Sequence, residues 1–371
     1  MQFKLTDDQQ SIADGLKQIL KGVVTDESLK ALSKEGVWFH QRAWQALAEA
    51  EMLGLGLPEA HGGAGFGMLE LCLLLEQVGR TVAPIPALET LVSAGLPIAQ
   101  FGTDAQRARL LPGIATGEQI LTAALVDAFT RDPRAPAATA TRDGDGFLVS
   151  GTFTNVAYVE QAARVLLAAK TSAGVVVCLL DPKAAGVAVD TQRGTNTQPL
   201  SRLTLSNARV PASDVLGDEQ SGASILDFTL QRTLVGMAAL QYGVAREALI
   251  MTARYASERK QFGMPIGMFQ AVKQRLGDAY IDVGCMEVTM LQAAFKLDAE
   301  RDASADILTA KFWAAEGGQR VLFAAQHVHG GMGFDRDYPL FRYFLTGKHL
   351  EFTLGGANET IEHLGALLAA G

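Results

Sequence analysis

Cysteine is scarce in this chain: there are only three, far apart and without a CxxC pair. Cys72, Cys178 and Cys285 are therefore expected to be small core residues in a reduced compartment. An excess of basic residues is also lacking, because 32 Lys and Arg face 40 Asp and Glu, for a net charge of −8 and a pI near 5.3. This balance argues against nucleic acid or an anionic membrane as the main partner.

Long apolar runs are absent as well. None approaches the roughly 18 residues of a membrane span, and the first residues lack the basic-then-apolar order of a signal peptide. We therefore expect a soluble protein of the cytoplasmic type. The chain has 371 residues, of which 48% are hydrophobic and 19% charged. That length accommodates two or three domains with a large core.

Helical periodicity dominates the first domain, predicted to span residues 1–119. Thr6 is expected to cap a helix whose apolar stripe runs from Ile12 to Leu20. A glycine-rich loop at 57–65 follows no strand and is expected to be a structural turn rather than a phosphate site. Further helices are predicted at residues 44–52, 69–79, 88–101 and 104–111.

Composition changes near Gln119. Residues 120–217 are rich in Val, Thr and Gly and show period-two segments, including 147–154, 164–168, 174–180 and 202–206, which predict an antiparallel β domain. From about Ser221 the pattern returns to helices at roughly 222–258, 268–300, 303–328 and 339–368. They predict an antiparallel four-helix bundle in a third domain, 218–371, and the fold class is α+β.

Two motifs stand out in the third domain. The first is Tyr255-Ala-Ser-Glu-Arg-Lys-Gln-Phe-Gly263, with Arg259 and Lys260 expected in the last helical turn before Gly263 and Pro265. A charged cluster followed by an aromatic suits an anion that carries a flat group, although an ordinary charged helix end has the same composition. The second motif is His327-Val-His-Gly-Gly-Met-Gly-Phe334, whose glycines let backbone N–H groups approach a phosphate.

Together, RxxFG followed by HGGxG resembles the acyl-CoA dehydrogenase family of flavoproteins, and the resemblance extends over nearly the whole chain. It implies that family's fold, in which a helical domain, a β domain and a helical bundle follow one another. It also implies the family reaction, α,β-dehydrogenation of an acyl-CoA thioester. A carboxylate takes the α proton while the β hydrogen leaves as hydride to the flavin of FAD.

The catalytic base of the family is not matched. One family position is the Glu of a Glu-Gly-Thr motif, and Leu354 stands there in Phe352-Thr-Leu-Gly-Gly. Some members place the Glu on the first bundle helix, before an Arg, and Gln231 stands there. Neither side chain can take a proton. Glu351 and Glu359 are near in sequence but are expected to point elsewhere.

The flavin-contacting motifs are not matched either. In place of the family's Thr-Glu-Pro-x-x-Gly-Ser-Asp, the chain has Leu121-Thr-Ala-Ala-Leu-Val-Asp-Ala-Phe129. In place of Trp-Ile-Thr it has Asn155-Val-Ala157. The next residue, Tyr158, fits a core, surface or substrate-lining position equally well.

The family residues that hold the adenosine diphosphate end of a neighbouring subunit's FAD are retained. By resemblance, Arg259 pairs with the pyrophosphate, Gln261 offers an amide and Phe262 packs on the adenosine end. Gly330 and Gly331 admit the phosphate to the backbone, and His327 replaces the usual Gln. No carboxylate or thiol completes a metal site with His327 and His329, so we predict none; the other histidines are expected to be surface or satisfied core residues.

A chain that keeps the residues acting in trans and lacks those acting in cis resembles the smaller, non-catalytic chain of heteromeric α2β2 steroid side-chain acyl-CoA dehydrogenases. The implied cofactor is FAD shared at a subunit interface. The implied partners are a base-bearing subunit, an acyl-CoA substrate and an electron-accepting flavoprotein, with no nucleic acid or membrane. Two alternatives stay open: a self-sufficient homotetramer with a relocated base, and a non-enzymatic scaffold that has lost FAD.

Overall fold

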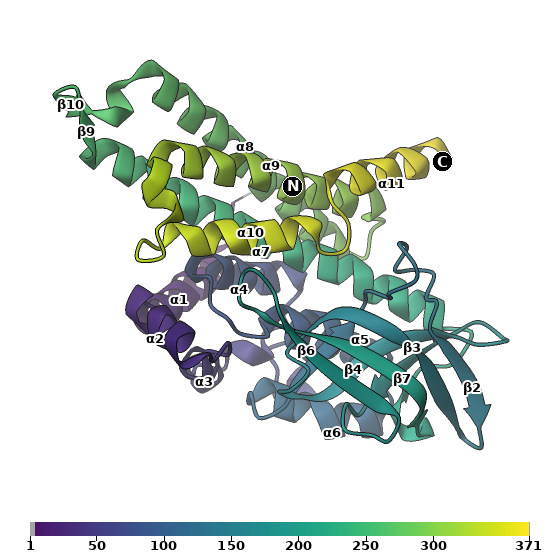
Figure 1. The fold of residues 1–371 in the computed structure, drawn as a ribbon. Helices are drawn as coiled ribbons and strands as arrows, with labels where there is room; N and C mark the ends of the chain where they lie inside the picture. Colours follow the sequence, from purple (N-terminus) through teal and green to yellow (C-terminus); the bar gives the residue numbers. More distant parts are fainter. Residues whose placement is uncertain (1–3, 371) are drawn as a thin grey trace. The chain divides into compact units, whose positions relative to one another are not determined.

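The computed structural model describes residues 4–370 (Figure 1). They divide into two compact units, each assembled from separate stretches of sequence. Unit 1 comprises the described residues of Met1–Val37, Met68–Ala83 and Leu234–Gly371. Unit 2 comprises Trp38–Gly67 and Pro84–Thr233.

Unit 1 is built from long helices. The first begins at a capping box, as predicted: the Thr6 hydroxyl accepts from the backbone N–H of Gln9 at 3.3 Å, and the Gln9 side chain accepts from the Thr6 N–H at 3.0 Å. The later helices are connected by the hairpin of β9 (Lys260–Gln261) and β10 (Met264–Pro265) and by the short elements η5 (Ile266–Met268) and η6 (Gly330–Phe334). The helices of unit 1 are α1 (Asp7–Val23), α2 (Asp26–Glu35), α4 (Met68–Thr81), most of α7 (Gly222–Glu258), α8 (Gln270–Asp298), α9 (Ser304–His329), α10 (Leu340–Phe352) and α11 (Ala357–Ala370).

Helix α7 is long and apolar enough to cross a membrane by length and composition, with a mean hydropathy of 1.2 in its most apolar window. However, 67% of that window is buried, as in the core helix of a folded domain. Glycines bring it against α4: a Cβ on Gly79 would lie 2.1 Å from the Leu240 carbonyl oxygen, and one on Gly243 equally close to that of Glu76. The two backbones therefore touch.

Two details of the third predicted domain are wrong. Helix α7 ends at Glu258, and Lys260 lies in strand β9 rather than in the last helical turn. The expected single helix over 339–368 is two helices, α10 and α11, divided after Phe352. The cause is local, because Leu354 and Gly355 both take positive φ, at 55° and 102°, which a continuing helix does not allow.

Unit 2 combines short helices with an eight-stranded sheet in the order β6-β7-β3-β2-β4-β5-β8, with β1 paired to β4. Most pairs are antiparallel, as predicted, but β1 pairs with β4 in parallel, and so does one position of β2. The strands are β1 (Ile120–Ala124), β2 (Thr139–Asp143), β3 (Gly146–Ala157), β4 (Ala162–Lys170), β5 (Val175–Leu180), β6 (Val187–Arg193), β7 (Pro199–Val210) and β8 (Val215–Leu216). The helices are α3 (Gln41–Glu49), a π-helix η3 (Leu88–Gly95), α5 (Leu96–Phe101), α6 (Asp104–Ala115), the short turns η1 (Met52–Gly54), η2 (Glu59–His61) and η4 (Ala212–Asp214), and the first turns of α7.

Period-two burial occurs where the sequence predicted it in β7, where Leu203 and Leu205 are buried and Arg202, Thr204 and Ser206 between and beside them are exposed. Strands β4 and β5 are instead buried on both faces over residues 165–169 and 176–180. The glycine-rich loop is a structural turn, as expected. A Cβ on Gly63 would lie 2.0 Å from the Leu57 carbonyl oxygen, so the glycine is needed by the backbone itself.

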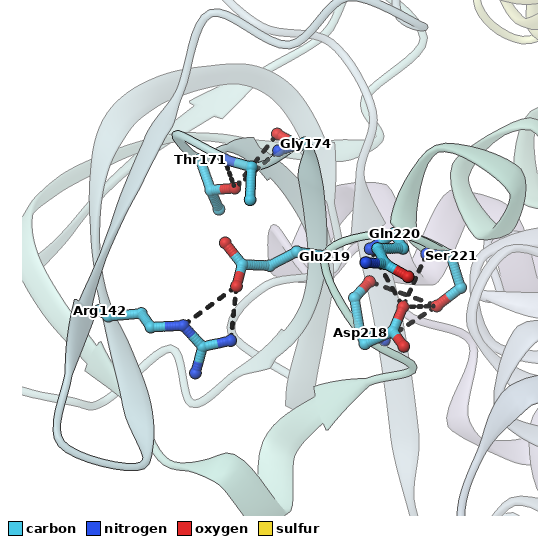
Figure 2. A network of polar contacts seen from close by, with 8 residues as sticks. Arg142, Thr171, Gly174, Asp218, Glu219, Gln220 and Ser221 are labelled. Carbon is cyan, nitrogen blue, oxygen red and sulfur yellow. Dashed lines mark hydrogen bonds and ion pairs between the residues drawn. The ribbon is translucent and has the colours of Figure 1, made fainter.

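The start of α7 is fixed within unit 2 by the network of Figure 2. The Asp218 carboxylate accepts from the backbone N–H of Ser221 at 2.7 Å and caps the helix. Beside it, the Arg142 guanidinium of β2 bonds the Glu219 carboxylate at 2.5 and 3.0 Å. Hydrogen bonds from Thr171 and Arg142 hold the pKa of Glu219 below its usual value. The helix that carries Gln231 and ends just before Arg259 is thus anchored at its start.

Candidate functional site

The RxxFG motif forms a tight hairpin in unit 1, at the junction of α7 and α8 (Figure 1). Strands β9 (Lys260–Gln261) and β10 (Met264–Pro265) pair antiparallel, and the Ile266 N–H donates to the Arg259 carbonyl at 2.8 Å. The two turn residues, Phe262 and Gly263, have φ of 51° and 80°, as a type I′ turn requires. The left-handed backbone costs a non-glycine residue about 1–2 kcal/mol, so Phe262 occupies this turn against its conformational preference.

The side chains of this hairpin face solvent. Phe262 is 91% exposed, and its ring lies edge to face with that of Phe269, with 6.1 Å between centroids. Gln261 is exposed and donates its amide to the Lys260 carbonyl at 2.8 Å. Arg259 is exposed, and among the described residues its guanidinium contacts no carboxylate. A free guanidinium beside an exposed aromatic ring can receive an anion and a flat group together.

The second motif forms an open turn at the end of α9. Gly330 has φ 60° and ψ −136°, a backbone conformation reserved for glycine. A Cβ on either Gly330 or Gly331 would meet nothing within 4 Å, and both glycines are exposed. His327 is also exposed, with its ring 6.3 Å from that of Phe323. The turn therefore leaves its backbone accessible to an approaching group.

A buried aromatic contact brings the two motifs together. The Tyr255 ring of α7 stacks on the His329 ring of α9 with 4.2 Å between centroids and 23° between planes. His329 Nδ1 donates to the Ala325 carbonyl at 2.9 Å, and its Nε2 then accepts from the Tyr338 hydroxyl at 3.0 Å. Burial lowers the pKa of His329. His329 is a satisfied core residue, as expected, and it joins the ends of the two helices that precede Arg259 and Gly330.

The first base position lies in the turn after α10. Leu354 follows the last turn of α10, and in that turn the Leu350 carbonyl accepts a hydrogen bond from Lys311 Nζ at 2.9 Å. Lys311 is 1% exposed, and burial lowers its pKa to about 7. Glu351 is paired with Lys348 at 2.6 Å, and Glu359 accepts from a turn N–H at 3.4 Å. Both carboxylates flanking Leu354 therefore have structural partners.

The second base position is also engaged. The Gln231 amide donates to the Asp227 carboxylate at 2.7 Å, one turn earlier on α7. The other oxygen of Asp227 accepts from Arg134 at 2.8 Å. Asp227 is a carboxylate that the sequence reasoning missed, because its nearness to Gln231 depends on side-chain direction rather than on a motif. Its ion pair with Arg134 opposes any role as a free base.

The stretches that replace the family's flavin contacts bind each other within unit 2. The Thr122 hydroxyl donates to the Ala157 carbonyl at 2.7 Å. The Thr154 N–H donates to the Val126 carbonyl at 2.9 Å, and the Asp127 carboxylate accepts from three N–H groups of the following loop at 2.8–3.1 Å. The hydroxyl and the N–H groups named here are thus hydrogen-bonded within the unit.

Tyr158, whose place the sequence left open, is a buried residue of unit 2. It packs with Ala157, Leu200 and Phe39, and its backbone is left-handed at φ 55°. Burial, with help from the charge of Glu89, raises the pKa of its phenol well above the usual value. Glu89 lies on the π-helix, where burial raises its pKa to about 7 and Gln198 donates to it at 3.3 Å. No sequence motif indicated Glu89.

The residues that the family resemblance assigns to the two ends of FAD have different surroundings in this chain. Within the described residues, the hairpin and the glycine turn offer a guanidinium with no carboxylate partner, an exposed ring and open backbone, which suit a nucleotide diphosphate. The positions that would meet the flavin ring offer apolar side chains and polar groups bonded to one another. No group of three or more His, Cys, Asp and Glu that could hold a metal occurs within residues 4–370.

The chain resembles known proteins over its full length. Family models for the acyl-CoA dehydrogenase N-terminal domain and C-terminal domain match residues 6–118 and 220–366. Acyl-CoA dehydrogenase FadE27 of Mycobacterium tuberculosis is 36% identical, covering 100% of this chain and 99% of that protein; FadE28 of the same organism is 32% identical, covering 99% and 98%.

Two solved structures are also similar to this chain. The ChsE4-ChsE5 complex from Mycobacterium tuberculosis superposes with a TM-score of 0.94 at 37% identity, covering 100% of this chain and 99% of the matched chain. A variant of the Tcur3481-Tcur3483 steroid ACAD gives 0.92 at 40% identity, covering 98% of each chain. Fold and relatives define a class, the FAD-binding oxidoreductases that act on CH–CH bonds. Within that class, the chain belongs to the acyl-CoA dehydrogenase family, and the predicted α+β fold is confirmed.

Proposed function

We propose that this chain is the non-catalytic subunit of a heteromeric acyl-CoA dehydrogenase and completes the FAD site of a base-bearing partner in trans. The observation that carries the proposal is an asymmetry. Arg259, Phe262, Gly330 and Gly331 are exposed to solvent, and among the described residues the Arg259 guanidinium contacts no carboxylate. The base positions hold Leu354 and Gln231, neither of which can accept a proton.

The relatives support a particular assembly and substrate class. One is a steroid ACAD with two named components, and another is the ChsE4-ChsE5 complex. By this similarity we assign the chain to an α2β2 enzyme that dehydrogenates the CoA thioester of a steroid side chain. An electron-accepting flavoprotein would reoxidise it, and the assembly would be cytoplasmic.

Each retained residue then has a defined task toward the partner's FAD. Arg259 would pair its guanidinium with the pyrophosphate. Gly330 donates its N–H to the Gln326 carbonyl and would leave room for the phosphate, and Gly331 would offer its backbone N–H. Phe262 covers the adenosine end, and Gln261 and His327 supply polar contacts at its edge. When bound, FAD supplies the hydride acceptor of the reaction; the partner supplies the base.

The test is Arg259→Ala in the co-expressed two-chain complex. A charge-assisted hydrogen bond contributes about 1.5–3 kcal/mol, so the affinity for FAD should fall roughly 10- to 150-fold while the subunit stoichiometry is unchanged. FAD per complex is measured by absorbance after dialysis. Arg254→Ala is the matched control, because Arg254 lies one turn earlier and is exposed but paired with Glu258.

Two results would contradict the proposal. Unchanged FAD content in Arg259→Ala would remove the trans role. Purification of this chain alone as a yellow protein with one FAD per chain would instead favour a self-sufficient dehydrogenase, and Glu351 and Glu359 would then be tested as displaced bases.

A further inference from the structure

Three aromatic rings pack together where α7 and α9 end. Besides the stack of Tyr255 on His329, the Tyr338 ring lies 5.1 Å from the His329 ring and 6.3 Å from the Tyr255 ring, between centroids. Tyr338 belongs to the segment between η6 and α10. The three rings therefore join three parts of unit 1: the end of α7, the end of α9 and the segment that follows the glycine turn. We call these three residues the ring cluster.

The ring cluster is connected to both motifs through the backbone. Arg259 donates its backbone N–H to the Tyr255 carbonyl at 2.8 Å, so the position of Tyr255 fixes where the hairpin starts. His329 immediately precedes Gly330, the first residue of the glycine turn. Among the described residues, no hydrogen bond or ring contact joins the hairpin directly to the glycine turn. The separation of the two motifs is therefore set through the ring cluster.

The imidazole of His329 is held at both of its nitrogens. Nδ1 donates to the Ala325 carbonyl at 2.9 Å, and Nε2 accepts from the Tyr338 hydroxyl at 3.0 Å. Two directed hydrogen bonds and one stacked neighbour give this ring, which is 4% exposed, a single orientation. A phenylalanine could stack on Tyr255 but could make neither hydrogen bond. The imidazole therefore contributes orientation in addition to packing.

Helix α2 braces the segment that carries Tyr338. Lys30 Nζ donates to the Asp337 carbonyl at 3.0 Å, one residue before Tyr338, and also pairs with Asp26 at 2.8 Å. The Asp335 carboxylate accepts from the Asp337 N–H at 2.9 Å. Tyr338 is therefore fixed by its own surroundings and presents its hydroxyl to His329 from a defined position.

We propose that His329 is a positioning residue for the adenosine diphosphate end of the partner's FAD, an inference that rests on the proposed function. Because His329 is buried, it acts through Tyr255 and Tyr338 rather than by contact with the cofactor. It sets the spacing between the Arg259 guanidinium and the backbone of the glycine turn. A diphosphate engages both groups together only when their spacing matches its own, so fixing that spacing in advance strengthens binding.

The decisive variant is Tyr338→Phe in the co-expressed two-chain complex, because it removes one hydroxyl and leaves all three rings in place. The dissociation constant of FAD should rise roughly 2- to 12-fold, as expected for the loss of one hydrogen bond. Equilibrium dialysis against a series of FAD concentrations measures it. At saturating FAD, kcat should equal that of the native complex, because the reacting end of the cofactor is not affected.

Tyr343→Phe is the matched control. It also removes a phenol that donates a hydrogen bond, to the Arg80 carbonyl at 2.8 Å, but this bond joins α10 to α4. Both variants should lower the thermal midpoint, and only Tyr338→Phe should weaken FAD binding. His329→Phe is a second variant and should weaken FAD binding at least as much as Tyr338→Phe. Adding Tyr338→Phe to it should cause no further loss, because the hydrogen bond between the two side chains is already absent.

Native FAD affinity in both Tyr338→Phe and His329→Phe, with affinity still lowered by Arg259→Ala, overturns the positioning inference and leaves the proposed function intact. Equal losses of affinity in Tyr338→Phe and Tyr343→Phe also overturn it, because they would reflect a general destabilisation of unit 1. Native affinity in Arg259→Ala defeats the proposed function itself. The Arg259 variant and the ring-cluster variants thus separate the two failures.

Discussion

Replacing Lys311 with methionine should remove a large part of the pH dependence of stability. The ammonium group is buried and donates to the last-turn carbonyls of α10, at 2.9 Å to Leu350 and 3.4 Å to Glu351. Burial lowers its pKa from 10.5 to about 7. Between these two values the unfolded chain holds a proton that the folded chain has released. Stability therefore rises with pH across this window and is lowest where the folded lysine is charged.

The magnitude follows from the shift. Each pH unit inside the window changes the free energy of unfolding by about 1.4 kcal/mol per proton. From about pH 7.5 to about pH 9.5 the native chain should thus gain roughly 2.5 kcal/mol relative to Lys311→Met. At the lower pH the variant also leaves two carbonyls without a donor, which costs about 1–3 kcal/mol. The slope, not the absolute stability, is the discriminating quantity.

Denaturant unfolding followed by circular dichroism at several pH values measures that slope. Lys273→Met, at an exposed position of α8, is the matched control and should leave the slope unchanged. Parallel pH profiles for the native chain and Lys311→Met would refute the reasoning, because they would mean that the amine titrates alike in the folded and unfolded states.

Two further results are expected. His349 is partly buried, and this burial together with the charge of Lys311 lowers its pKa to about 4. Stability should therefore be lost as pH falls from about 6.5 to 4, by about 1.4 kcal/mol per unit. His349→Gln should flatten this acid limb in the same unfolding experiment, and an unchanged limb would contradict the assignment. Leu354→Glu should not make the isolated chain turn over an acyl-CoA, because Thr122 and Ala157 use their polar groups on each other; turnover with an artificial electron acceptor would show that the carboxylate was the only missing part.

Local signals in the sequence predicted much of the fold. The Thr6 cap, the alternating burial of β7 and the structural loop before α4 each depend on residues a few positions apart, where spacing alone decides the outcome. The break between α10 and α11 at Leu354 also had a signal in the sequence, the Gly355-Gly356 pair. The helical periodicity on both sides of the pair nevertheless favoured one continuous helix. Parallel pairing of β1 with β4 had none, because register between strands distant in sequence is set by packing.

The site was predictable in part for the same reason. Arg259, Phe262 and the glycines belong to motifs, so their types and spacing were readable. The Tyr255–His329 stack was not, because it joins helices whose contact depends on the fold. Asp227 and Glu89 were missed likewise: their relevance comes from Gln231, Arg134 and the burial around the π-helix.

Left-handed backbone marks four positions described above: Asn155, Tyr158, Phe262 and Leu354, each with φ between 51° and 55°. Three of them stand at or beside the places where the family has its flavin contacts or its base, and none is glycine. In this chain the backbone therefore bends at these places without the flavin-contacting or proton-accepting side chains of the family. An engineer who wished to rebuild a catalytic pocket would begin with side-chain replacement at these bends and would leave the course of the loops unchanged.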